Sequence, residues 1–525
     1  MGRLLNAGAA LTRNASVMPD KVGVRDLDRS LTFREWNRRA CLLANALVGL
    51  GLGKGDRVAV LGYNCIEWME IYAALSKAGL VAVPLNFRLV GREIRYLLED
   101  SGATALIVQD ALTGPIEEIR SDLAIPGGRY VLFGGAARAG YLDYEALIGG
   151  AADREPDGHR DENDTALFLY TSGTTGSPKG AMRSHRAEAL HSLVCALGFG
   201  FTPADVGLLV MPLCHANSLW FGQTITGLGG TAVIYNRPSF DPELLLRLFA
   251  EERVSFASLV PTHYIMTLGL SPATLERYDV SGVRSLLISS APARLDIKQA
   301  ILDHFRSTGL FEAYGSTEAG WVTVLRPEEQ FEKLGSIGRE CPGTNAIRLL
   351  GEDGAEVATG EVGELYFDTP ATFQGYWNLP EKTAASFRDG WCTVGDMARR
   401  DEDGYYHLAD RRANLIISGG ENVYPSEVEN MLGAHPAIKD VAVVGLAHPV
   451  WGETVHAVVV LHEGARLEGD ELLAFASVRM AGYKRPRSVA FIAETEMPRT
   501  ATGKILHRVL RERLTEVVHA SDAHF

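Results

Sequence analysis

The chain has 525 residues, of which 46% are hydrophobic and 22% charged, and this is the composition of a globular protein too long for one ordinary core. Its formal net charge of −14 argues against nucleic acid or an anionic membrane surface as a partner. The six cysteines are scattered and include no CxxC pair, so neither a zinc site nor a disulfide framework is expected, and a reducing cytoplasm is the predicted location. No membrane span is expected, because the sequence lacks a run of about eighteen apolar residues.

The first part of the chain alternates strand and helix patterns. Apolar residues recur with helical spacing on one face of residues 32–50, and a short buried strand is expected at residues 58–61. Strand, helix and strand at this spacing predict parallel crossovers, and therefore an α/β sheet that is covered on both faces. The pattern continues with helices expected at residues 68–78 and 91–100 and strands at residues 81–85 and 104–108.

A second sheet, a β-rich subdomain and a small C-terminal domain are expected further along. From about Ile347, short strands and glycine turns predict the β-rich subdomain, and charged residues around Arg411 mark the expected boundary between domains 1–411 and 412–525. The apolar runs that predict the second sheet are residues 208–211, 231–235, 256–260, 286–288 and 311–314. The small domain is expected to contain helices near residues 425–432, 470–480 and 504–514 and strands at residues 441–444 and 455–461.

The stretch from Thr171 to Gly180 combines glycines, hydroxyl side chains and one lysine, and it follows an apolar strand pattern at residues 165–170. Glycine lets a ligand approach the backbone N–H groups closely, and hydroxyls with a lysine suit a polyphosphate. The stretch is not a Walker A loop, because Lys179 is preceded by Pro178 and followed by glycine. A flexible surface turn is the alternative interpretation.

The order of these residues, Tyr170-Thr171-Ser172-Gly173-Thr174-Thr175-Gly176-Ser177-Pro178-Lys179-Gly180, closely resembles the phosphate loop of the acyl-adenylating superfamily of acyl-CoA synthetases, peptide-synthetase adenylation domains and luciferases. The resemblance implies an α/β fold with a large N-terminal domain of stacked α/β sheets, a small β-rich subdomain and a mobile α+β C-terminal lid domain. It also implies ATP, Mg²⁺ and coenzyme A as cofactors. The loop residues implied to bind ATP are Thr171, Ser172, Gly173, Thr174, Thr175, Gly176 and Lys179.

The segment from Phe311 to Glu318 resembles the adenine and magnesium segment of the same superfamily. An aromatic ring at Tyr314 can stack on adenine, and a hydroxyl at Thr317 can donate to the α-phosphate. A carboxylate at Glu318 suits Mg²⁺, which prefers oxygen ligands. By itself, Glu318 would be interpreted as an acid at the start of a helix. The other residues of this segment that are implied to contact the nucleotide are Glu312, Ala313, Gly315 and Ser316.

Further segments match the superfamily residue by residue. Lys504 resembles the adenylation lysine, which can balance charge on a transferring phosphoryl group, although alone it would be an ordinary first-turn lysine. His215 resembles a residue that lines the acyl pocket, and a buried core histidine is the alternative. The remaining implied contacts are Ser290, Ala291 and Pro292 at adenine, Asp396 and Arg411 at ribose, Ser418, Gly419 and Gly420 beside pantetheine, and Trp451, Tyr483 and Arg485 at the CoA nucleotide, with Arg88 as a weaker candidate. Arg411, Trp451 and the basic turn at residues 483–486 have ordinary surface positions as their alternative interpretation.

The acid itself cannot be derived from these motifs. Tyr314 is not preceded by the tryptophan that shortens the pocket of acetate-type members, so a larger acid is expected. Asn217 and Thr262 are candidates to meet a polar substituent. The aromatic residues expected to wall the pocket are Trp220, Phe221 and Trp321.

The sequence therefore predicts an AMP-forming acyl-CoA ligase for a medium-to-large alicyclic, aromatic or fatty acid, as a monomer or a homodimer. One alternative is a ligase specialised for thioester formation from acyl-AMP, because Ala413 stands at the hinge where relatives usually carry Asp or Lys. A second is a stand-alone adenylating enzyme that loads a carrier protein. A luciferase-like oxygenase and a non-enzymatic acyl-adenylate binder are further alternatives, although a binder would be expected to lose Lys504 or Glu318.

Overall fold

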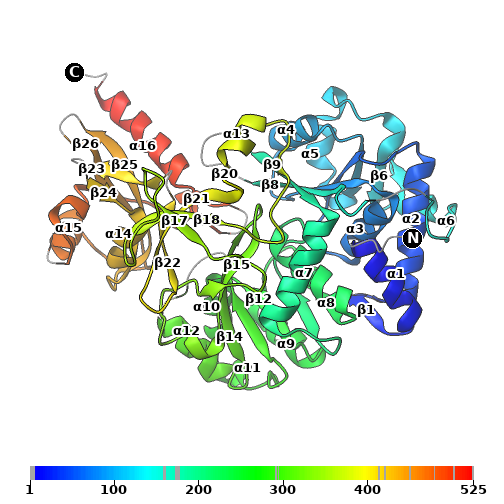
Figure 1. The fold of residues 1–525 in the computed structure, drawn as a ribbon, viewed down its shortest axis with the longest axis horizontal. Coiled ribbons are helices and arrows are strands. Elements are labelled where there is room, and N and C mark those ends of the chain that lie inside the picture. The colour runs from blue at the N-terminus through cyan, green and yellow to red at the C-terminus, as the bar shows by residue number, and fades with distance from the viewer. Residues whose placement is uncertain are drawn as a thin grey trace. The chain divides into compact units, whose positions relative to one another are not determined.

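The computed structural model describes residues 6–157, 161–171, 178–289, 293, 295–411, 414–418, 421–448, 451–477, 479–500 and 503–522. The chain, drawn as a ribbon in Figure 1, divides into two compact units. One unit comprises Met1–Ile347 and Phe367–Cys392, and the other comprises Arg348–Tyr366 and Thr393–Phe525. The domain boundary expected at Arg411 stays a prediction.

The first large sheet of the first unit contains the strands that the opening alternation predicts. Its strand order, within the described residues, is β19 (Gly375–Tyr376), β9 (Lys179–Ser184), β8 (Thr165–Thr171), β4 (Val81–Leu85), β3 (Arg57–Leu61), β5 (Ala105–Gln109), β6 (Tyr130–Phe133) and β7 (Leu142–Asp143). β3 pairs in parallel with both β4 and β5, so the predicted parallel crossovers are confirmed. β8 pairs in parallel with β4 and antiparallel with β9, which makes this side of the sheet mixed.

The second large sheet contains the five apolar runs that predict it. Its strand order, within the described residues, is β16 (Arg339–Glu340), β15 (Gly320–Leu325), β14 (Gly309–Ser316), β13 (Ser285–Ile288), β12 (Phe256–Leu259), β10 (Val206–Leu209), β11 (Thr231–Ile234), β1 (Val22–Arg25) and β2 (Ser30–Thr32). β10 to β14 pair in parallel, and β15 returns antiparallel to β14. The carboxyl ends of these parallel strands are where α/β sheets usually bind ligands.

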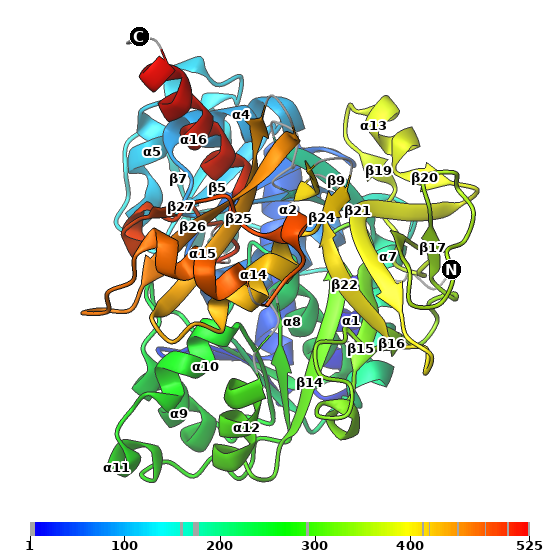
Figure 2. The same ribbon diagram turned by 90° about the vertical axis from the view of Figure 1, so that its left-hand side faces the viewer.

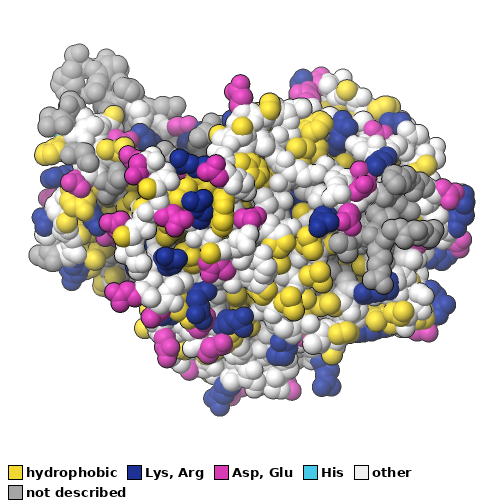
Figure 3. Space-filling view, viewed as in Figure 1, with side chains coloured by type: hydrophobic (Ala, Val, Ile, Leu, Met, Phe, Trp, Pro, Cys, Tyr) yellow, Lys and Arg dark blue, Asp and Glu magenta, His cyan; other side chains and the backbone are white. Residues whose placement is uncertain are grey.

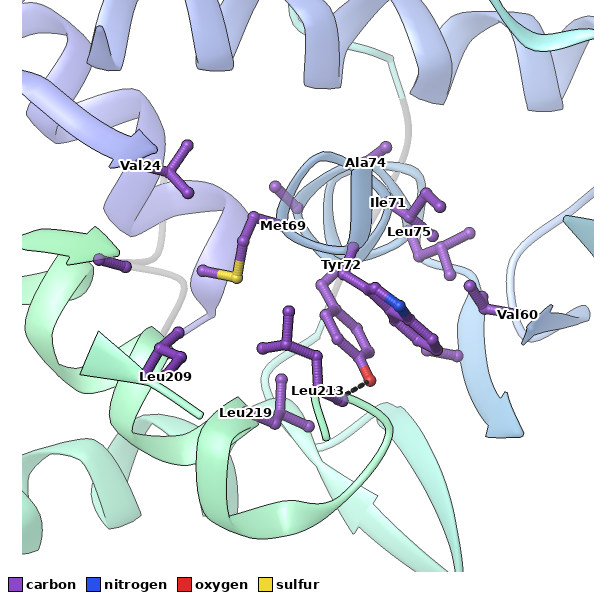
Figure 4. Packing of buried hydrophobic residues seen from close by; sticks show 14 of the residues in the cluster. Val24, Val60, Met69, Ile71, Tyr72, Ala74, Leu75, Leu209, Leu213 and Leu219 are labelled. Atoms are coloured by element: carbon purple, nitrogen blue, oxygen red, sulfur yellow. Dashed lines mark hydrogen bonds between the residues drawn. The ribbon is translucent and has the colours of Figure 1, made fainter. Parts of the chain in front are cut away.

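Helix α3 (Ile66–Ala78) lies between the two sheets. Figure 4 shows Met69 and Tyr72 of this helix directed toward Leu209 and Leu213, while Ile71 and Leu75 lie on the side of Val60 in the first sheet. The Tyr72 hydroxyl donates to the carbonyl oxygen of Leu213 at 2.9 Å. Nearly every position of α3 is buried, including Glu70 and Lys77, which form ion pairs with Arg39 and Glu155.

Local capping explains where several helices begin. α2 (Phe33–Gly49) starts after Thr32, whose side chain accepts from the N–H of Glu35 while the Glu35 carboxylate accepts from the N–H of Thr32. The other helices of the first unit are α1 (Ala7–Val17), α4 (Gly91–Ser101), α5 (Gly114–Glu117), α6 (Tyr144–Gly149), α7 (His185–Phe199), α8 (Ala216–Leu228), α9 (Pro242–Glu251), α10 (Pro261–Leu268), α11 (Pro272–Leu275), α12 (Leu295–His304) and α13 (Pro380–Ala385).

The second unit begins with the β-rich subdomain that its glycine turns predict. β17 (Arg348–Leu350) pairs antiparallel with β18 (Val362–Phe367). β21 (Trp391–Arg400) belongs to the same sheet, and β22 (Tyr406–Arg411) pairs antiparallel with it. A short strand in the first unit, β20 (Phe387–Arg388), forms a hairpin with the start of β21.

The C-terminal part of the second unit has its own sheet with helices on both faces. Its strands, within the described residues, are β24 (Glu421–Val423), β23 (Ile416–Ser418), β26 (Gly452–Leu461), β25 (Ile438–His448) and β27 (Ser488–Phe491). Val441 and Val443 of β25 pack with α14 (Pro425–Gly433) and α15 (Gly469–Ser477), whereas Ala442 and Val444 pack with α16 (His507–Asp522). This alternation along the strand places α14 and α15 on one face and α16 on the other, as can be followed in Figure 2.

One predicted element of this unit is wrong at its start. The last helix was expected from residue 504, but α16 begins at His507. Gly503 has a φ of +86°, and Arg499 forms a β-bridge with Ile505. This turn conformation keeps Lys504 outside the helix, so its interpretation as a first-turn lysine is also wrong.

The surface carries mixed charge. Figure 3 shows basic and acidic side chains interspersed over the face in view. Among the described residues, no helix is long and apolar enough to cross a membrane.

Candidate active site

The predicted phosphate loop connects β8 to β9. Thr171 at the end of β8 is the register partner of Lys179 at the start of β9, so these two residues lie side by side at the base of the loop. The expected strand at residues 165–170 is confirmed as β8. The loop reverses the chain between antiparallel strands, whereas a Walker A loop leads from a strand into a helix.

Thr317 and Glu318 lie in the tight turn between β14 and β15. Glu318 is therefore not an acid at the start of a helix. A Cβ atom at Gly315 would lie 2.2 Å from the carbonyl oxygen of Gly320, so the hairpin can close this tightly only with glycine at position 315. Tyr314 immediately precedes Gly315 on β14 and is buried.

Three consecutive carbonyl groups of this turn each accept a hydrogen bond. The pairs are Arg183 Nη1 to Thr317 O at 2.7 Å, Phe373 N to Glu318 O at 2.8 Å and Thr369 Oγ1 to Ala319 O at 2.6 Å. The donors come from β9 and from residues 369–373, which are far apart in the sequence. These contacts fix the backbone beneath the two predicted catalytic side chains.

The carboxylate of Glu318 is buried and accepts a hydrogen bond from the Tyr376 hydroxyl at its Oε1 atom, at 2.7 Å. No group of three metal-ligating side chains occurs among the described residues. An oxygen donor that stands without other metal-ligating side chains suits Mg²⁺, which is usually held by one or two carboxylates together with substrate phosphates. The residues present therefore fit a magnesium ion that arrives with ATP.

Arg183, which the sequence reasoning missed, supports the turn from the core side. Its side chain is 0% exposed, its Nε donates to Glu188, and its guanidinium lies 4.9 Å from the centroid of the Trp220 ring. Glu188 also accepts from Trp220 Nε1 at 3.0 Å. The sequence of β9, Lys-Gly-Ala-Met-Arg-Ser, contains no apolar pattern that could have identified Arg183 as buried.

The three expected aromatic walls belong to a packed cluster. Trp220, Phe221 and Trp321 are all buried, and the Trp321 ring lies 6.2 Å from that of Trp220 and 5.8 Å from that of Phe221, between centroids. His191 packs 4.1 Å from Trp220 and accepts from the backbone N–H of Trp321. Burial and the nearby charge of Arg183 hold the pKa of His191 well below its usual range, so its ring is a neutral core element.

His215 caps the start of α8 and faces the first sheet. Its Nε2 lies 3.2 Å from Nδ2 of Asn86, an amide donor, so the ring nitrogen accepts. Burial lowers the pKa of His215 to about 4, and Arg88 acts in the same direction. Burial and Arg88 likewise lower the pKa of His263 on α10 to about 4. The structure thus gathers Arg88, His215 and His263 and keeps both imidazoles neutral at pH 7.

A polar seam runs across the carboxyl ends of β12 and β13. Asn217 Nδ2, in the first turn of α8, donates to Ser258 Oγ at 3.0 Å and to Ser289 Oγ at 3.1 Å. The Oδ1 atom of Asn217 is buried and has no hydrogen-bond partner among the described residues. Thr262, the other residue expected to meet a polar substituent, is exposed on α10.

Glu312 has a different environment from the rest of its segment. Its buried carboxylate forms an ion pair with the wholly buried ammonium of Lys298 on α12. Burial raises the pKa of Glu312, while Lys298 opposes that shift. The Glu312 side chain is thus paired inside the protein core, so a nucleotide contact predicted for this residue would have to use its backbone.

In the second unit, Asp396 and Arg411 are brought together. They are register partners on the antiparallel strands β21 and β22, although they are far apart in the sequence. Asp396 is buried. The two residues predicted for the ribose therefore come from one place in the fold.

Two of the predicted CoA residues, Ser418 and Trp451, lie close together. Ser418 at the end of β23 pairs with Gly452 of β26, which follows Trp451, and the Trp451 side chain is 47% exposed. Tyr483 is exposed in a short 3₁₀ turn, and Arg485 Nε donates to the carbonyl of Met480 at 2.9 Å. An exposed indole beside a strand end can accept a nucleotide base on its face.

Lys504 is exposed in a closed turn. Its N–H donates to Thr500 Oγ1 at 3.1 Å, and its carbonyl accepts from the N–H of Thr500 at 2.7 Å. Arg499 fixes one side of the turn by donating to Gly503 O at 2.8 Å. On the other side, His507 Nε2 lies 2.6 Å from Glu429 Oε1 of α14. Hydrogen bonds of Arg499, Thr500 and His507 thus flank Lys504.

Several predicted residues lie outside the described residues. They are Ser172, Gly173, Thr174, Thr175 and Gly176 of the phosphate loop, Ser290, Ala291 and Pro292, Ala413 at the hinge, and Gly419 and Gly420. The side chain of Arg411 is likewise not described.

Comparison with known proteins shows the family of this chain. Residues 11–377 match the AMP-binding enzyme family, and residues 427–504 match the AMP-binding enzyme C-terminal domain. A feruloyl-CoA synthase from Amycolatopsis is 39% identical, with 96% of this chain and 98% of that protein covered. An indoleacetate–CoA ligase from Aromatoleum aromaticum is 36% identical, with 94% and 95% covered. The ATP-bound structure of MatB from Rhodopseudomonas palustris superposes with a TM-score of 0.87 at 31% identity, with 98% of this chain and 99% of that chain covered.

The chain belongs to the AMP-binding enzyme family. The predicted resemblance to AMP-forming acyl-CoA synthetases of the acyl-adenylating superfamily is confirmed, and so is the α/β fold with a large and a smaller part. The expectation of an acid–thiol ligase that uses ATP, Mg²⁺ and coenzyme A is confirmed by the same relatives, together with a structure of an o-succinylbenzoate CoA synthetase in complex with ATP and a magnesium ion.

Proposed function

We propose that this acyl-CoA ligase acts on an aromatic carboxylic acid whose ring carries a polar substituent. Relatives act on ferulate and indoleacetate, and a structural neighbour at 27% identity, with a TM-score of 0.89, is an anthranilate CoA ligase in complex with anthranoyl-AMP. Relatives that act on long-chain fatty acids are 34% identical, so the relatives alone do not distinguish an aromatic acid from a fatty acid as the substrate.

The observation that favours a polar substituent is the seam formed by Asn217, Ser258 and Ser289. Its members line the carboxyl ends of parallel strands, where α/β sheets bind ligands. The buried Asn217 Oδ1 can accept a hydrogen bond from a ring hydroxyl or amine. A fatty acyl chain would leave that acceptor without a donor, which costs about 1–3 kcal/mol.

In the first half-reaction, a carboxylate oxygen of the acid attacks the α-phosphorus of ATP, and pyrophosphate leaves. Lys179 and the phosphate-loop residues hold the phosphates, and Thr317 donates to the α-phosphate. Lys504 balances the charge that develops on the transferring group. Magnesium, when bound with ATP through Glu318, neutralises phosphate charge. The fixed carbonyls of the turn from Thr317 to Ala319 support these roles.

In the second half-reaction, the thiol of coenzyme A loses its proton and attacks the acyl carbonyl, and AMP leaves. Ser418 and its two glycines guide the pantetheine, while Trp451, Tyr483 and Arg485 hold the nucleotide of coenzyme A. The exposure of Trp451 next to the pairing of Ser418 with Gly452 supports this assignment. Asp396 and Arg411 bind the ribose, and their pairing across two strands supports that role.

The remaining assignments concern the acyl pocket, the adenine base, the domain boundary and the cellular location. Neutral His215 lines the acyl pocket, Tyr314 stacks on adenine, and the backbone of residues 312–316 contacts the nucleotide. The domain boundary lies at Arg411, with a mobile lid beyond it. The protein resides in the cytoplasm, which six free, buried cysteines support.

A panel of acids tests the proposed substrate. 4-Hydroxylated and unsubstituted cinnamates, indoleacetate and palmitate are compared by kcat/KM for AMP release. We expect the wild type to prefer a hydroxylated aromatic acid. Asn217→Leu should lower the preference for 4-hydroxycinnamate over cinnamate about tenfold, which corresponds to about 1.4 kcal/mol. The control Thr262→Ala, at an exposed position on α10, should leave that ratio unchanged. Palmitate as the best substrate, with a ratio insensitive to Asn217, would refute the proposal.

A second candidate function is acyl transfer to a carrier protein. A fatty acid–[acyl-carrier-protein] ligase from Streptomyces coeruleorubidus is 34% identical, with 92% of both chains covered. Thioester yield with coenzyme A and with a phosphopantetheinylated carrier protein, at equal thiol concentration, separates the two acceptors. Faster transfer to coenzyme A is expected, because Trp451 offers an exposed ring for its nucleotide.

A further inference from the structure

Tyr376 on β19 contacts two site residues that the sequence assigns to different ligands. Its hydroxyl donates to Glu318 Oε1 at 2.7 Å, and the ammonium of Lys179 lies 4.1 Å from the centroid of its ring. One buried ring therefore contacts both the carboxylate expected to hold Mg²⁺ and the lysine expected to hold phosphate. The sequence reasoning did not identify this residue.

The ring is fixed by its strand and by its packing. Tyr376 is the register partner of Ala181 on β9, two residues after Lys179, so the phenol and the lysine project from adjacent strands. The N–H of Tyr376 donates to Thr383 Oγ1 at 2.9 Å, and the Phe373 ring packs edge-on at 4.9 Å. With backbone and ring both held, the hydroxyl has a defined position relative to the base of the phosphate loop.

The phenol can act only as a donor toward Glu318. A carboxylate oxygen accepts hydrogen bonds, so the proton of this contact is that of the phenol O–H. The hydrogen bond occupies one oxygen, Oε1, and sets the orientation of the second. The ring face meets the Lys179 ammonium in a cation–π contact, which restricts that side chain in the same way.

We propose that Tyr376 is a positioning residue that couples Glu318 to Lys179 and thereby sets the dependence of ATP binding on Mg²⁺. The inference rests on the proposed roles of these two residues. The hydroxyl orients the carboxylate for the metal, and the ring orients the ammonium for the phosphates. A tyrosine that served only packing would influence stability but not the metal requirement.

The test is ATP binding by isothermal titration calorimetry, with Mg²⁺ varied and without acid substrate or turnover. Tyr376→Phe keeps the ring and removes the hydroxyl. We expect it to raise the Mg²⁺ concentration for half-maximal ATP binding about tenfold and to leave ATP binding in EDTA unchanged, since a charge-assisted hydrogen bond is lost while the cation–π contact stays. Tyr376→Leu should also weaken ATP binding in EDTA severalfold, because the ring is lost as well.

A matched control separates positioning from stability. Tyr144 is a wholly buried tyrosine in the same unit whose hydroxyl donates to Glu70 Oε2 at 2.6 Å. Tyr144→Phe should lower the melting temperature to a similar extent as Tyr376→Phe and leave the Mg²⁺ requirement at the wild-type value. Glu318→Gln and its combination with Tyr376→Phe complete a cycle in which the double variant should need no more Mg²⁺ than Glu318→Gln alone.

The outcomes distinguish the inference from the proposed function. A wild-type protein that does not bind MgATP would refute the proposed function itself. A wild type that binds MgATP, together with a Tyr376→Phe variant of unchanged Mg²⁺ requirement, would refute only the positioning role. An equal change in Tyr144→Phe would show that the effect reflects stability, and additive losses in the cycle would show that Tyr376 does not act through Glu318.

Discussion

Replacing Arg183 should separate the stability of the fold from the geometry of the catalytic turn. Its guanidinium is wholly buried, pairs with Glu188 and donates to Thr317 O at 2.7 Å. Arg183→Met preserves much of the volume and removes the charge. The Glu188 carboxylate then keeps only the Trp220 N–H as its described side-chain donor.

The size of the effect follows from these contacts. Removing one partner of a buried ion pair costs about 3–5 kcal/mol, because the other charge stays buried. For a unit of roughly 370 residues, with an unfolding entropy of about 2.1 cal/mol/K per residue, this lowers the melting temperature by about 4–6 °C. The double variant Arg183→Met/Glu188→Gln removes the stranded charge and keeps an acceptor for Trp220, so it should recover about half of that loss.

Adenylation should not recover in the double variant. Both variants leave the Thr317 carbonyl without the Arg183 donor, and a misplacement of about 1 Å at a catalytic group can cost roughly 10²-fold in rate. Melting temperature by calorimetry and acid-dependent ATP–pyrophosphate exchange are measured on the same preparations. Adenylation that returns together with stability would show that Arg183 acts on the fold alone, and equal melting temperatures for the two variants would refute the stranded-charge argument.

A matched ion pair elsewhere in the first unit provides the control. Arg39 donates from Nε to the wholly buried Glu70 at 2.6 Å, within a different helix pair. Arg39→Met should lower the melting temperature in a similar way and leave the pyrophosphate exchange rate of the folded fraction unchanged.

Four further outcomes are expected. Lys504→Ala should reduce acyl-AMP formation about 10²–10³-fold while supplied acyl-AMP and coenzyme A still give thioester, and an equal loss of both steps would contradict its assignment. Trp451→Ala should raise the KM for coenzyme A severalfold, since base stacking contributes about 1–3 kcal/mol, without changing pyrophosphate exchange; an unchanged KM would make it a surface residue. Burial disfavours the charged ring of His507, but Glu429 outweighs burial and raises its pKa. The stabilisation by the His507–Glu429 pair is therefore complete below about pH 6.5, the pKa of histidine in the unfolded chain, and is lost as pH rises through the raised pKa of the folded state. The melting temperatures of wild type and His507→Gln should differ most near pH 6 and converge at alkaline pH. A pH-independent difference contradicts this. If position 413 limits the exchange between half-reactions, Ala413→Asp should change the ratio of their rates, and a change below about twofold in both would exclude a hinge effect.

The alternation of strands and helices could be predicted because it is encoded locally. The parallel strands β3, β4 and β5 and the buried helix α3 were predicted from spacing alone, with boundaries shifted by one or two residues. Each element carries its own apolar period, and that period is visible in a short window.

Contacts between distant segments could not be predicted in this way. Tyr376 reaches Lys179 only because β19 pairs with β9, and a two-residue strand has no period to recognise. Arg183 on β9 reaches Thr317 in the turn between β14 and β15, so this contact joins the two large sheets. These pairings depend on tertiary packing, which composition and periodicity do not contain.

Individual side chains were misjudged where local pattern and burial disagree. Lys504 was placed in a helix because the following residues are helical, but a glycine with positive φ keeps it in a turn. Trp220 and Trp321 pack around His191, a contact that the local pattern does not contain, and their place at the acyl pocket stays a prediction. The order of residues in the motifs predicts the chemistry of the site, whereas the contacts that support those residues could be identified only from the structure.

This protein is expected to form an acyl-adenylate and to transfer its acyl group to coenzyme A. Acid-dependent ATP–pyrophosphate exchange, measured first without coenzyme A and then with it, tests this most directly, with a hydroxylated cinnamate as the acid. We expect exchange without coenzyme A, and AMP with an equal amount of acyl-CoA once the thiol is added. Exchange that requires coenzyme A, or AMP release without thioester, would contradict it.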